Sequence, residues 1–274
     1  MDKYQALQDL LRTYQSALVA FSGGVDSTLL AVVAHRALAD QFLAVTAVSP
    51  TYPEQQLEEA LALARQFHLP HQVVHTNEFE SPDFLVNPPE RCYYCKLDLY
   101  RQLRGLADQK GLAVILDGAN RDDEGDYRPG HRAAAEMGVR SPFRELAFTK
   151  ADIRELSREL GIPTWDKPAY ACLASRIPYG TPITPEALAR IDGAEQFLAS
   201  LGLRVFRVRD HFPLARVEIG TTELELAWQN RQEIARRLHE LGFPFVTLDL
   251  DGFRSGSMNE LIKGAGGVAI APQK

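Results

Sequence analysis

The segment Ser22-Gly23-Gly24-Val25-Asp26-Ser27 constrains the fold most, because it lies between the apolar run ALVAF and a helical pattern. Two glycines let a backbone approach a polyanion closely, and a helix beginning there points its N–H groups at the same place. The hydroxyls of Ser22 and Ser27 add donors, and Asp26 predicts either a Mg²⁺ contact to the phosphates or a helix cap. The segment is not G-x-x-x-x-G-K-[ST], which disfavours a Walker-type hydrolase. We therefore predict a phosphate site in which strand, glycine turn and helix cooperate.

The first part of the chain alternates short β-rich apolar runs with helical patterns, which is typical of a parallel sheet covered by helices. We predict a doubly wound α/β domain over residues 1–165. The helix after Pro53 is expected to turn one apolar face, Leu57, Leu61, Ala64 and Phe67, to the sheet. The predicted strands are 17–21, 42–48, 71–75 and 112–117, and the predicted helices follow Asp26, Pro53, Lys96 and Thr149.

A proline-rich connection over residues 166–182, which carries Cys172, separates this domain from the rest of the chain. Residues 183–274 predict a smaller α+β domain. Its expected helices are 185–201 and 223–241, and its expected strands are 203–209, 214–219 and 245–250.

Composition narrows the possible functions of these two domains. Among 274 residues, 30 basic side chains face 36 acidic ones, giving a net charge of −6 and a pI near 5.7. The chain lacks the overall basic charge of many nucleic-acid binders, although a local basic groove remains open. It contains neither a secretory signal pattern nor a membrane-length apolar run, so we expect no membrane partner and a cytoplasmic location.

A second candidate nucleotide contact follows the strand predicted at 112–117. Asp117-Gly118-Ala119-Asn120 comes at the carboxyl end of that strand, the edge at which open α/β sheets bind ligands. Asn120 could contact the nucleotide or Mg²⁺. The alternative is an acidic, solvated turn, because Asp and Asn are ordinary turn residues.

Three cysteines are too few to form a disulfide framework in a chain of this length. Cys92 and Cys95 form a C-x-x-C pair in a loop just before a predicted helix, and Cys172 lies in a later loop. A C-x-x-C pair can place two thiolates on one metal, and a distant third can complete a three-point site with one iron of a four-iron cluster left open. The alternatives are buried thiols or a labile Cys92–Cys95 disulfide.

The SGGVDS segment resembles the SGGxDS motif of the PP-loop ATP pyrophosphatase superfamily, which binds the pyrophosphate of ATP during adenylation. The segments NPPERCYYCK, PAYACLASRIPYG, RVRDHFPLARVE and GFRSGSMNE further resemble the ATP-dependent sacrificial sulfur transferases that mature the nickel-pincer cofactor of lactate racemase. This resemblance implies use of ATP and Mg²⁺ to adenylate a carboxylate of pyridinium-3,5-biscarboxylic acid mononucleotide. Sulfur delivery then gives the thiocarboxylate.

The resemblance also implies roles for the cysteines. Cys172 lies at the family's sulfur-bearing position, where some members sacrifice one cysteine sulfur and keep dehydroalanine. Cys92 and Cys95 make the chain similar to the branch in which three cysteines hold a [4Fe-4S] cluster. One departure is Ala119, where related nucleotide loops often have Thr or His.

Four residues of the second domain are candidates for binding the substrate. Arg207 and Arg209 alternate along a predicted strand, so both guanidiniums project to one face and could bind a substrate phosphate. Glu195 and Glu218 resemble acidic positions near the family's substrate site. The alternatives are surface arginines on a half-solvated strand and ordinary exposed carboxylates.

The prediction from the sequence is a homo-oligomeric sulfur transferase acting on a small pyridinium mononucleotide, with Asp26 and Cys172 as its catalytic residues. A tRNA thiolase with a similar loop and three cysteines is the nearest alternative, but the acidic pI and the lack of an RNA-binding module count against it. An ammonia-using amide ligase would need a glutaminase-type domain, for which the chain lacks the length. A non-catalytic nucleotide sensor remains a further alternative.

Overall fold

The computed structural model describes residues 3–125, 129–168, 171–254 and 256–257. The chain divides into two compact units, the first formed by Met1–Phe84 and Glu90–Tyr170, and the second by Leu85–Pro89 and Ala171–Lys274. The excursion into the second unit at Leu85–Pro89 was not anticipated from the sequence. Residues 258–260, which close the GFRSGSMNE segment, lie outside the described residues. No helix in the described part of the chain is long and apolar enough to cross a membrane.

The described part of the first unit centres on a four-stranded parallel sheet in the order β3-β2-β1-β4. Strand β4 lies on the opposite side of β1 from β2, so the strand order reverses between β1 and β4. The loops that follow these two strands therefore flank the crevice where doubly wound sheets bind ligands. The predicted α/β class is confirmed. The strands are β1 (Ala17–Ala20), β2 (Phe42–Val48), β3 (His71–His75) and β4 (Val114–Leu116).

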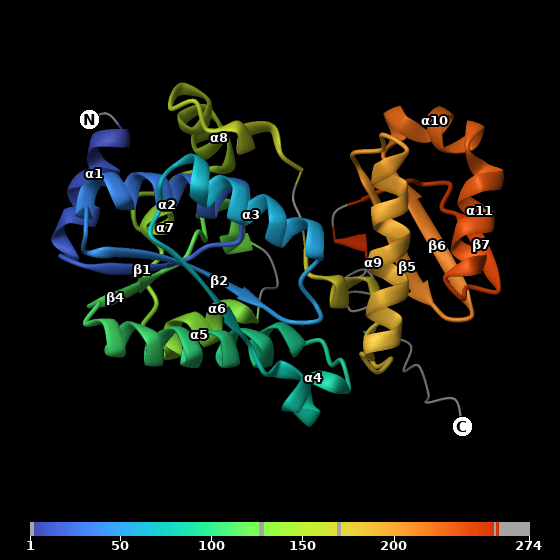
Figure 1. The fold of residues 1–274 in the computed structure, drawn as a ribbon, viewed down its shortest axis with the longest axis horizontal. Helices are drawn as coiled ribbons and strands as arrows, with labels where there is room; N and C mark the ends of the chain where they lie inside the picture. The colour runs from blue at the N-terminus through green and yellow to red at the C-terminus, as the bar shows by residue number, and fades with distance from the viewer. Residues whose placement is uncertain (1–2, 126–128, 169–170, 255, 258–274) are drawn as a thin grey trace. The chain divides into compact units, whose positions relative to one another are not determined.

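Helices cover both faces of this sheet (Figure 1). One layer contains α1 (Lys3–Thr13), α2 (Val25–Leu38), α3 (Glu54–Gln66) and α8 (Lys150–Glu159), and the other contains α5 (Arg91–Lys110) and α6 (Gly130–Glu136). Shorter elements connect them: η1 (Glu78–Glu80), α4 (Pro82–Leu85), η2 (Arg121–Gly125), α7 (Pro142–Glu145) and η3 (Pro163–Asp166).

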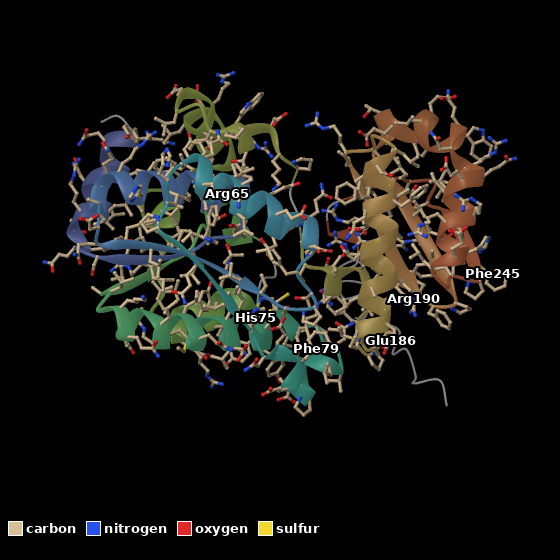
Figure 2. The ribbon with its side chains drawn as sticks, viewed as in Figure 1. Arg65, His75, Phe79, Glu186, Arg190 and Phe245 are labelled. Carbon is tan, nitrogen blue, oxygen red and sulfur yellow. The ribbon has the colours of Figure 1, made fainter. Side chains whose placement is uncertain are left out.

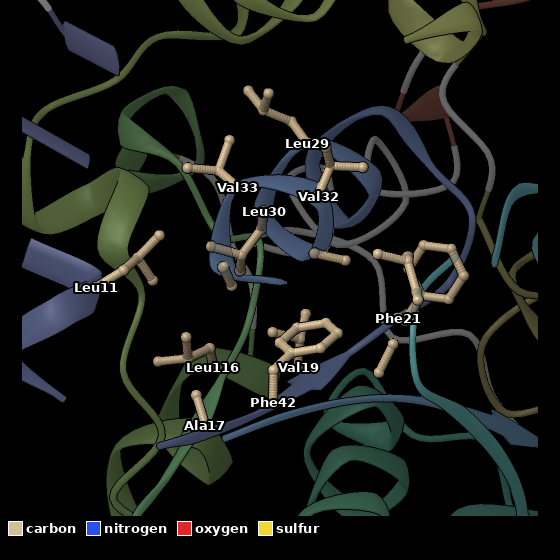
Figure 3. Packing of buried hydrophobic residues seen from close by; sticks show 14 of the residues in the cluster. Leu11, Ala17, Val19, Phe21, Leu29, Leu30, Val32, Val33, Phe42 and Leu116 are labelled. Carbon is tan, nitrogen blue, oxygen red and sulfur yellow. The ribbon is translucent and has the colours of Figure 1, made fainter. Parts of the chain in front are cut away.

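Alternation along β1 explains the two layers. Val19 packs toward Leu30 of α2, as Figure 3 shows, whereas Leu18 packs toward Leu103 of α5. Successive strand residues point to opposite faces, so an almost wholly apolar strand is buried from both sides.

The apolar face of α3 differs from the prediction. Its buried residues are Ala60, Leu63 and Ala64, whereas Leu57 and Leu61 are only half-buried. The helix is turned toward its alanines because Ala60 lies against the glycine turn. A Cβ added to Gly23 would come within 3.0 Å of the Ala60 Cα and Cβ atoms.

In the second unit, the described residues form a three-stranded sheet of β5 (Phe206–His211), β6 (Leu214–Ile219) and β7 (Phe245–Leu248). Strands β5 and β6 are antiparallel, while β6 and β7 are parallel. In Figure 2, Arg190 lies on α9 and Phe245 marks the beginning of β7. The other elements are η4 (Leu173–Arg176), α9 (Pro185–Ser200), η5 (Thr221–Glu223), α10 (Leu224–Gln229) and α11 (Arg231–Glu240).

The single helix predicted over residues 223–241 is wrong, because α10 and α11 are separate helices that meet at Asn230. The Asn230 side-chain amide donates to the Leu226 carbonyl at 2.8 Å. An Asn side chain that bonds a nearby backbone carbonyl competes with the regular helical pattern.

Hydrogen bonds attach the 85–89 segment to the rest of the second unit. Asn87, which is fully buried, donates from its side-chain amide to the carbonyls of Ile177, Pro178 and Thr181 at 3.3, 2.8 and 3.0 Å. Its own carbonyl accepts from the Gly180 N–H at 2.8 Å. This segment therefore fixes the backbone that follows the Cys172 turn.

Candidate functional site

The glycine turn after β1 is closed on itself by two serines. The Ser27 Oγ atom accepts from the Ser22 N–H at 3.2 Å and lies 3.0 Å from the Ser22 Oγ atom. Gly23 has a φ of +66°, a region that favours glycine, and Gly24 caps α2 in an extended conformation. The first N–H groups of a helix have no partner within the helix, so this turn directs donors toward the crevice.

Asp26, in the first turn of α2, joins this turn to the loop after β4. The Asn120 amide donates to Asp26 Oδ1 at 3.3 Å. A Cβ added to Gly118 would lie 2.9 Å from the Asp26 Cβ atom, so only glycine allows the two loops to approach this closely. The structure thus brings Ser22, Ser27, Asp26 and Asn120 together at the carboxyl edge of the sheet.

The loop after β4 is shaped by hydrogen bonds rather than left as a solvated acidic turn. Asp117 accepts from the Tyr100 hydroxyl at 3.0 Å, the Ser141 hydroxyl at 2.6 Å and the Ala119 N–H at 3.2 Å. Burial and the neighbouring Asp117 charge raise the pKa of Tyr100 well above its usual value, so the hydroxyl stays a donor. Asn120 itself is 4% exposed and therefore held in place.

Lys150 is a site residue that the sequence analysis missed. Its ammonium lies 2.5 Å from Asp26 Oδ2, and its backbone N–H donates to Asp122 Oδ2 at 2.8 Å. Lys150 is the first residue of α8, directly after Thr149, the N-cap residue of a capping box that Asp152 completes. A cation is disfavoured at a helix N-terminus. A lysine immediately after a helix cap was therefore the signal in the sequence.

Lys167 and Tyr52 also contact the glycine turn. The Lys167 ammonium donates to the Gly23 carbonyl at 3.1 Å and pairs with Glu59 at 2.5 Å. The Tyr52 hydroxyl donates to the Ser22 carbonyl at 2.9 Å. Burial, and then the Glu59 charge, raise the pKa of Tyr52, so it remains protonated. No motif in the sequence pointed to either contact.

The cysteine pair lies in a helix, not in the loop predicted before it. Helix α5 begins at Arg91, so Cys92 and Cys95 occupy its first turns, three residues apart and on one face. Cys172 caps the short η4 turn in the second unit. The three half-buried cysteines form no disulfide. Two thiols on one helix face fit a shared metal centre by donor chemistry. Within the described ranges, no three His, Cys, Asp or Glu side chains are gathered into a metal site.

Arg207 and Arg209 lie on one face of β5 and are buried, at 6% and 5% exposure, rather than half-solvated. On β6, Glu218 is paired in register with Arg207, and Arg216 with Arg209. Glu218 is fully buried and accepts from Arg209 and Arg216, at 2.8 Å in each case. Because burying a charge is costly unless it is paired, Glu218 stabilises Arg209 in the buried arginine face that it forms with Arg207, whereas Arg216 keeps 32% of its side chain exposed.

Glu195 is also buried rather than an ordinary exposed carboxylate. Its Oε1 atom accepts from the Arg176 Nε–H and from the backbone N–H of Val208 on β5, at 3.0 Å in each case. Arg176, a fully buried arginine of the Cys172 turn, is another residue that the sequence analysis missed. An arginine among apolar residues in a proline-rich connection gives no sign of such burial.

Some known proteins match only part of this chain. Residues 4–81 match the NAD synthase family. One subunit of the glutamine-hydrolyzing GMP synthase of Methanococcus maripaludis is 28% identical over 157 residues, which is 53% of this chain and 50% of that protein. The family match includes the glycine turn, and the GMP synthase subunit resembles this chain over about half of its length.

Two other relatives match nearly the full length. An uncharacterized protein of Synechocystis sp. is 43% identical over 95% of this chain and 98% of its own length. The pyridinium-3,5-bisthiocarboxylic acid mononucleotide synthase of Lactiplantibacillus plantarum is 39% identical, and the match covers 95% of each chain. Together with the glycine turn and its doubly wound sheet, this similarity shows that the chain belongs to the PP-loop sulfur transferase family that includes the pyridinium-3,5-bisthiocarboxylic acid mononucleotide synthase.

Proposed function

We propose that the protein uses ATP to adenylate a carboxylate of pyridinium-3,5-biscarboxylic acid mononucleotide and then inserts sulfur to give the thiocarboxylate. The observation that carries this proposal is the 39% identity, over 95% of the chain, to the synthase named for the bisthiocarboxylic product. The nucleotide loop and the buried arginine face support it, because the reaction needs a site for ATP and a site for an anionic mononucleotide.

Adenylation is the first step because a carboxylate oxygen is a poor leaving group. The substrate carboxylate attacks the α-phosphorus of ATP, the bond to pyrophosphate breaks, and the acyl adenylate carries AMP as a good leaving group. The N–H groups of the turn and the hydroxyls of Ser22 and Ser27 bind the departing pyrophosphate. Sulfur then attacks the acyl carbon and expels AMP.

Asp26 and Asn120 provide the oxygen ligands that suit Mg²⁺ at this edge of the sheet. The metal ion would neutralise charge on the phosphates when it is bound. Lys150, whose ammonium already contacts Asp26, supplies a protein cation at the same place. Because it is a flexible point charge, it can contact phosphate oxygens while Asp26 turns to the metal.

Arg207 and Arg209 bind the phosphate of the mononucleotide substrate in this proposal. Planar guanidiniums bind phosphate by paired hydrogen bonds, and desolvation strengthens those bonds. Glu218 fixes Arg209 at 2.8 Å, while Glu195 fixes the Arg176 side chain. Glu218 therefore serves the substrate site by holding Arg209, whereas Glu195 holds Arg176 beside the Cys172 turn.

In this proposal Cys92, Cys95 and Cys172 hold a [4Fe-4S] cluster, and the cluster rather than the Cys172 thiol carries the transferable sulfur. Two observations support the cluster. Cys92 and Cys95 share one face of α5, and none of the three cysteines forms a disulfide. When present, the cluster would provide an iron at which inorganic sulfide is held. On the family resemblance we also propose that the protein is a cytoplasmic homo-oligomer and acts on a small molecule rather than on nucleic acid.

Anaerobic incubation with ATP, Mg²⁺, sulfide and the pyridinium acceptor tests the function. We expect AMP and pyrophosphate in parallel with an acceptor whose mass reports replacement of oxygen by sulfur. Thiolation of bulk tRNA, together with a tRNA gel shift, would favour the tRNA thiolase. ATP binding without acceptor-dependent AMP would favour the nucleotide sensor.

The sulfur carrier is tested by comparing Cys92→Ala with Cys172→Ala. If three thiolates hold the cluster, both variants lose iron and acid-labile sulfide and both abolish transfer, while adenylation survives. If Cys172 alone is the donor, Cys92→Ala still transfers one sulfur per chain. Dehydroalanine at Cys172 in the reacted wild-type protein would contradict the cluster mechanism.

A further inference from the structure

The turn that carries Cys172 is anchored by a buried guanidinium. Arg176 Nη1 donates to the carbonyls of Ala171 and Cys172, at 2.5 and 2.9 Å, and lies 3.0 Å from the Ser175 hydroxyl oxygen. A single nitrogen thus holds the backbone on both sides of the Cys172 Cα atom.

The other side of the same guanidinium binds Glu195 of α9 as a fork. Arg176 Nε donates to Glu195 Oε1 at 3.0 Å, and Nη2 donates to Oε2 at 2.7 Å. Glu195 Oε1 also accepts from the Val208 N–H on β5, at 3.0 Å. A continuous series of hydrogen bonds therefore connects the Cys172 backbone to a helix and a strand.

The same turn contacts one of the arginines proposed to bind the substrate phosphate. Arg209 Nη1 donates to the Ser175 carbonyl at 3.0 Å, and its Nη2 donates to Glu218 Oε2 at 2.8 Å. The η4 turn and the two residues before it are thus held by two buried arginines, Arg176 paired with Glu195 and Arg209 paired with Glu218.

Stability alone does not require a charged pair in this position. Well-packed apolar side chains can often replace a buried ion pair without loss of stability, but they cannot donate to the carbonyls of Ala171 and Cys172. Arg176 is the residue of this network that combines full burial with donation to the Cys172 backbone. These hydrogen bonds fix the position of the Cys172 backbone, and catalysis requires that the groups taking part be held close to their productive arrangement.

We infer that Arg176, locked by Glu195, is a positioning residue that sets the place of the Cys172 sulfur relative to the phosphate-binding Arg209. The expected effect on sulfur transfer rests on the proposed function. The packing of Arg176, Glu195 and Arg209 belongs to the second unit alone. Arg176 bonds to the backbone of Cys172 and not to its sulfur, so it acts through Cys172.

The test is the double variant Arg176→Met/Glu195→Gln, which removes both charges and leaves no buried charge unpaired. The matched control is Arg190→Met/Asp210→Asn. That pair also joins α9 to β5, at 2.8 Å, and the other contacts described for it are with Phe212 and Phe243 rather than with the Cys172 turn. Both variants are compared with wild type for thermal melting, acceptor-dependent AMP formation and single-turnover sulfur transfer. Peptide-resolved alkylation by iodoacetamide reports the accessibility of Cys172.

We expect the Arg176→Met/Glu195→Gln variant to lose about 10²-fold in single-turnover sulfur transfer, a loss well beyond any change in acceptor-dependent AMP formation measured at saturating acceptor. Alkylation of Cys172 should accelerate several-fold, and Arg176→Lys, which keeps the charge but not the fork, should recover part of the transfer. The control should change melting without changing transfer or alkylation. Equal alkylation and transfer in the variant and the wild type would overturn the inference.

Failure of the proposed function would give a different result. The wild type would then transfer no sulfur to the pyridinium acceptor, yet Cys172 alkylation in the variant would still rise relative to the control if Arg176 holds the turn. If a global loss of folding accelerated alkylation in both double variants, the positioning role would be rejected.

Discussion

The nucleotide loop of the first unit and the arginine face of the second both gather charges, but they do so by different means. In the first unit the donors belong largely to the backbone, and the charged groups Asp26 and Lys150 keep 25% and 31% of their side chains exposed. In the second unit the donors are guanidiniums, and Arg209 and Glu218 are almost completely desolvated.

This difference predicts which substitutions lower activity and which lower stability. A charge that remains partly in water can be removed without leaving a buried partner unsatisfied, so its removal should lower the reaction rate and leave the free energy of unfolding nearly unchanged. A charge in a buried ion-pair network has buried partners, so its removal leaves them unpaired and lowers the free energy of unfolding. The two regions should therefore respond in opposite ways to removal of one carboxylate.

The largest effect on stability is expected for Glu218→Ala. This substitution leaves Arg209 and Arg216 without their shared buried carboxylate, which should cost about 3–5 kcal/mol of unfolding free energy. Urea unfolding followed by circular dichroism measures it. A loss no larger than that of the exposed control Glu240→Ala would break the contrast between the two regions.

Asp26→Asn should show the opposite pattern. AMP formation with the acceptor should fall about 10²–10³-fold, because a ligand for Mg²⁺ is lost where charge develops on pyrophosphate. The urea midpoint should stay close to that of the wild type, because Asp26 is partly exposed. Turnover like that of the wild type would remove this loop from the adenylation site.

Arg207→Ala should act on one substrate only. The acceptor's KM should rise about 10- to 100-fold, as expected for loss of a charge-assisted hydrogen bond, while ATP affinity stays unchanged. Steady-state kinetics with each substrate varied in turn measures the split. Equal losses for both substrates would place Arg207 outside the acceptor site.

Gly118→Ala sharpens the comparison within the first unit. Its Cβ would lie 2.9 Å from the Asp26 Cβ atom and 3.2 Å from the Ser27 nitrogen, so the two loops must separate. We expect a loss of about tenfold in kcat/KM for ATP. Gly105→Ala on α5 is the control, because its Cβ meets no atom within 4 Å and should stabilise the helix by about 0.5–1 kcal/mol.

The smallest predicted effect is a pH dependence shared by both units. Burial lowers the pKa of His71 in the first unit, and burial followed by the charges of Arg216 and Arg209 lowers that of His211 in the second. The unfolded chain therefore binds protons more readily, and stability is lost as pH falls below about 6.5 and levels off below the folded pKa.

His71→Gln and His211→Gln should each flatten the dependence of the melting temperature on pH between 7.5 and 5.5. Measuring both variants beside the wild type assigns the effect to one unit or to both. An unchanged slope in both variants would show that the two histidines titrate alike in the folded and unfolded chains.

The sequence predicted the first region better than the second for a physical reason. A glycine turn between an apolar strand and a helix is a local pattern, so Ser22, Gly23, Gly24 and Ser27 could be recognised from their neighbours along the chain. The parallel sheet followed from its apolar runs in the same way. Even there, Lys150 was missed because its contact with Asp26 spans 124 positions along the chain.

In the second region, burial depends on pairing between distant residues. Alternation correctly put Arg207 and Arg209 on one face of a strand, but it could not show that Glu218 of the next strand neutralises that face.

In the first unit, the start of α5 was predicted too late along the chain. No strong N-cap residue precedes Cys92, and the helix begins at Arg91 after Glu90, which makes no side-chain cap.

The 85–89 segment bears on where such a chain can be divided. Joining two genes end to end leaves each domain continuous along the chain, yet Asn87 of the second unit is encoded between two stretches of the first. Relatives such as the GMP synthase of Methanococcus maripaludis match only about half of this chain. The second unit therefore cannot be separated from the first by a single cut after Tyr170, because Asn87 would be parted from the carbonyls of Ile177, Pro178 and Thr181 that its side chain binds.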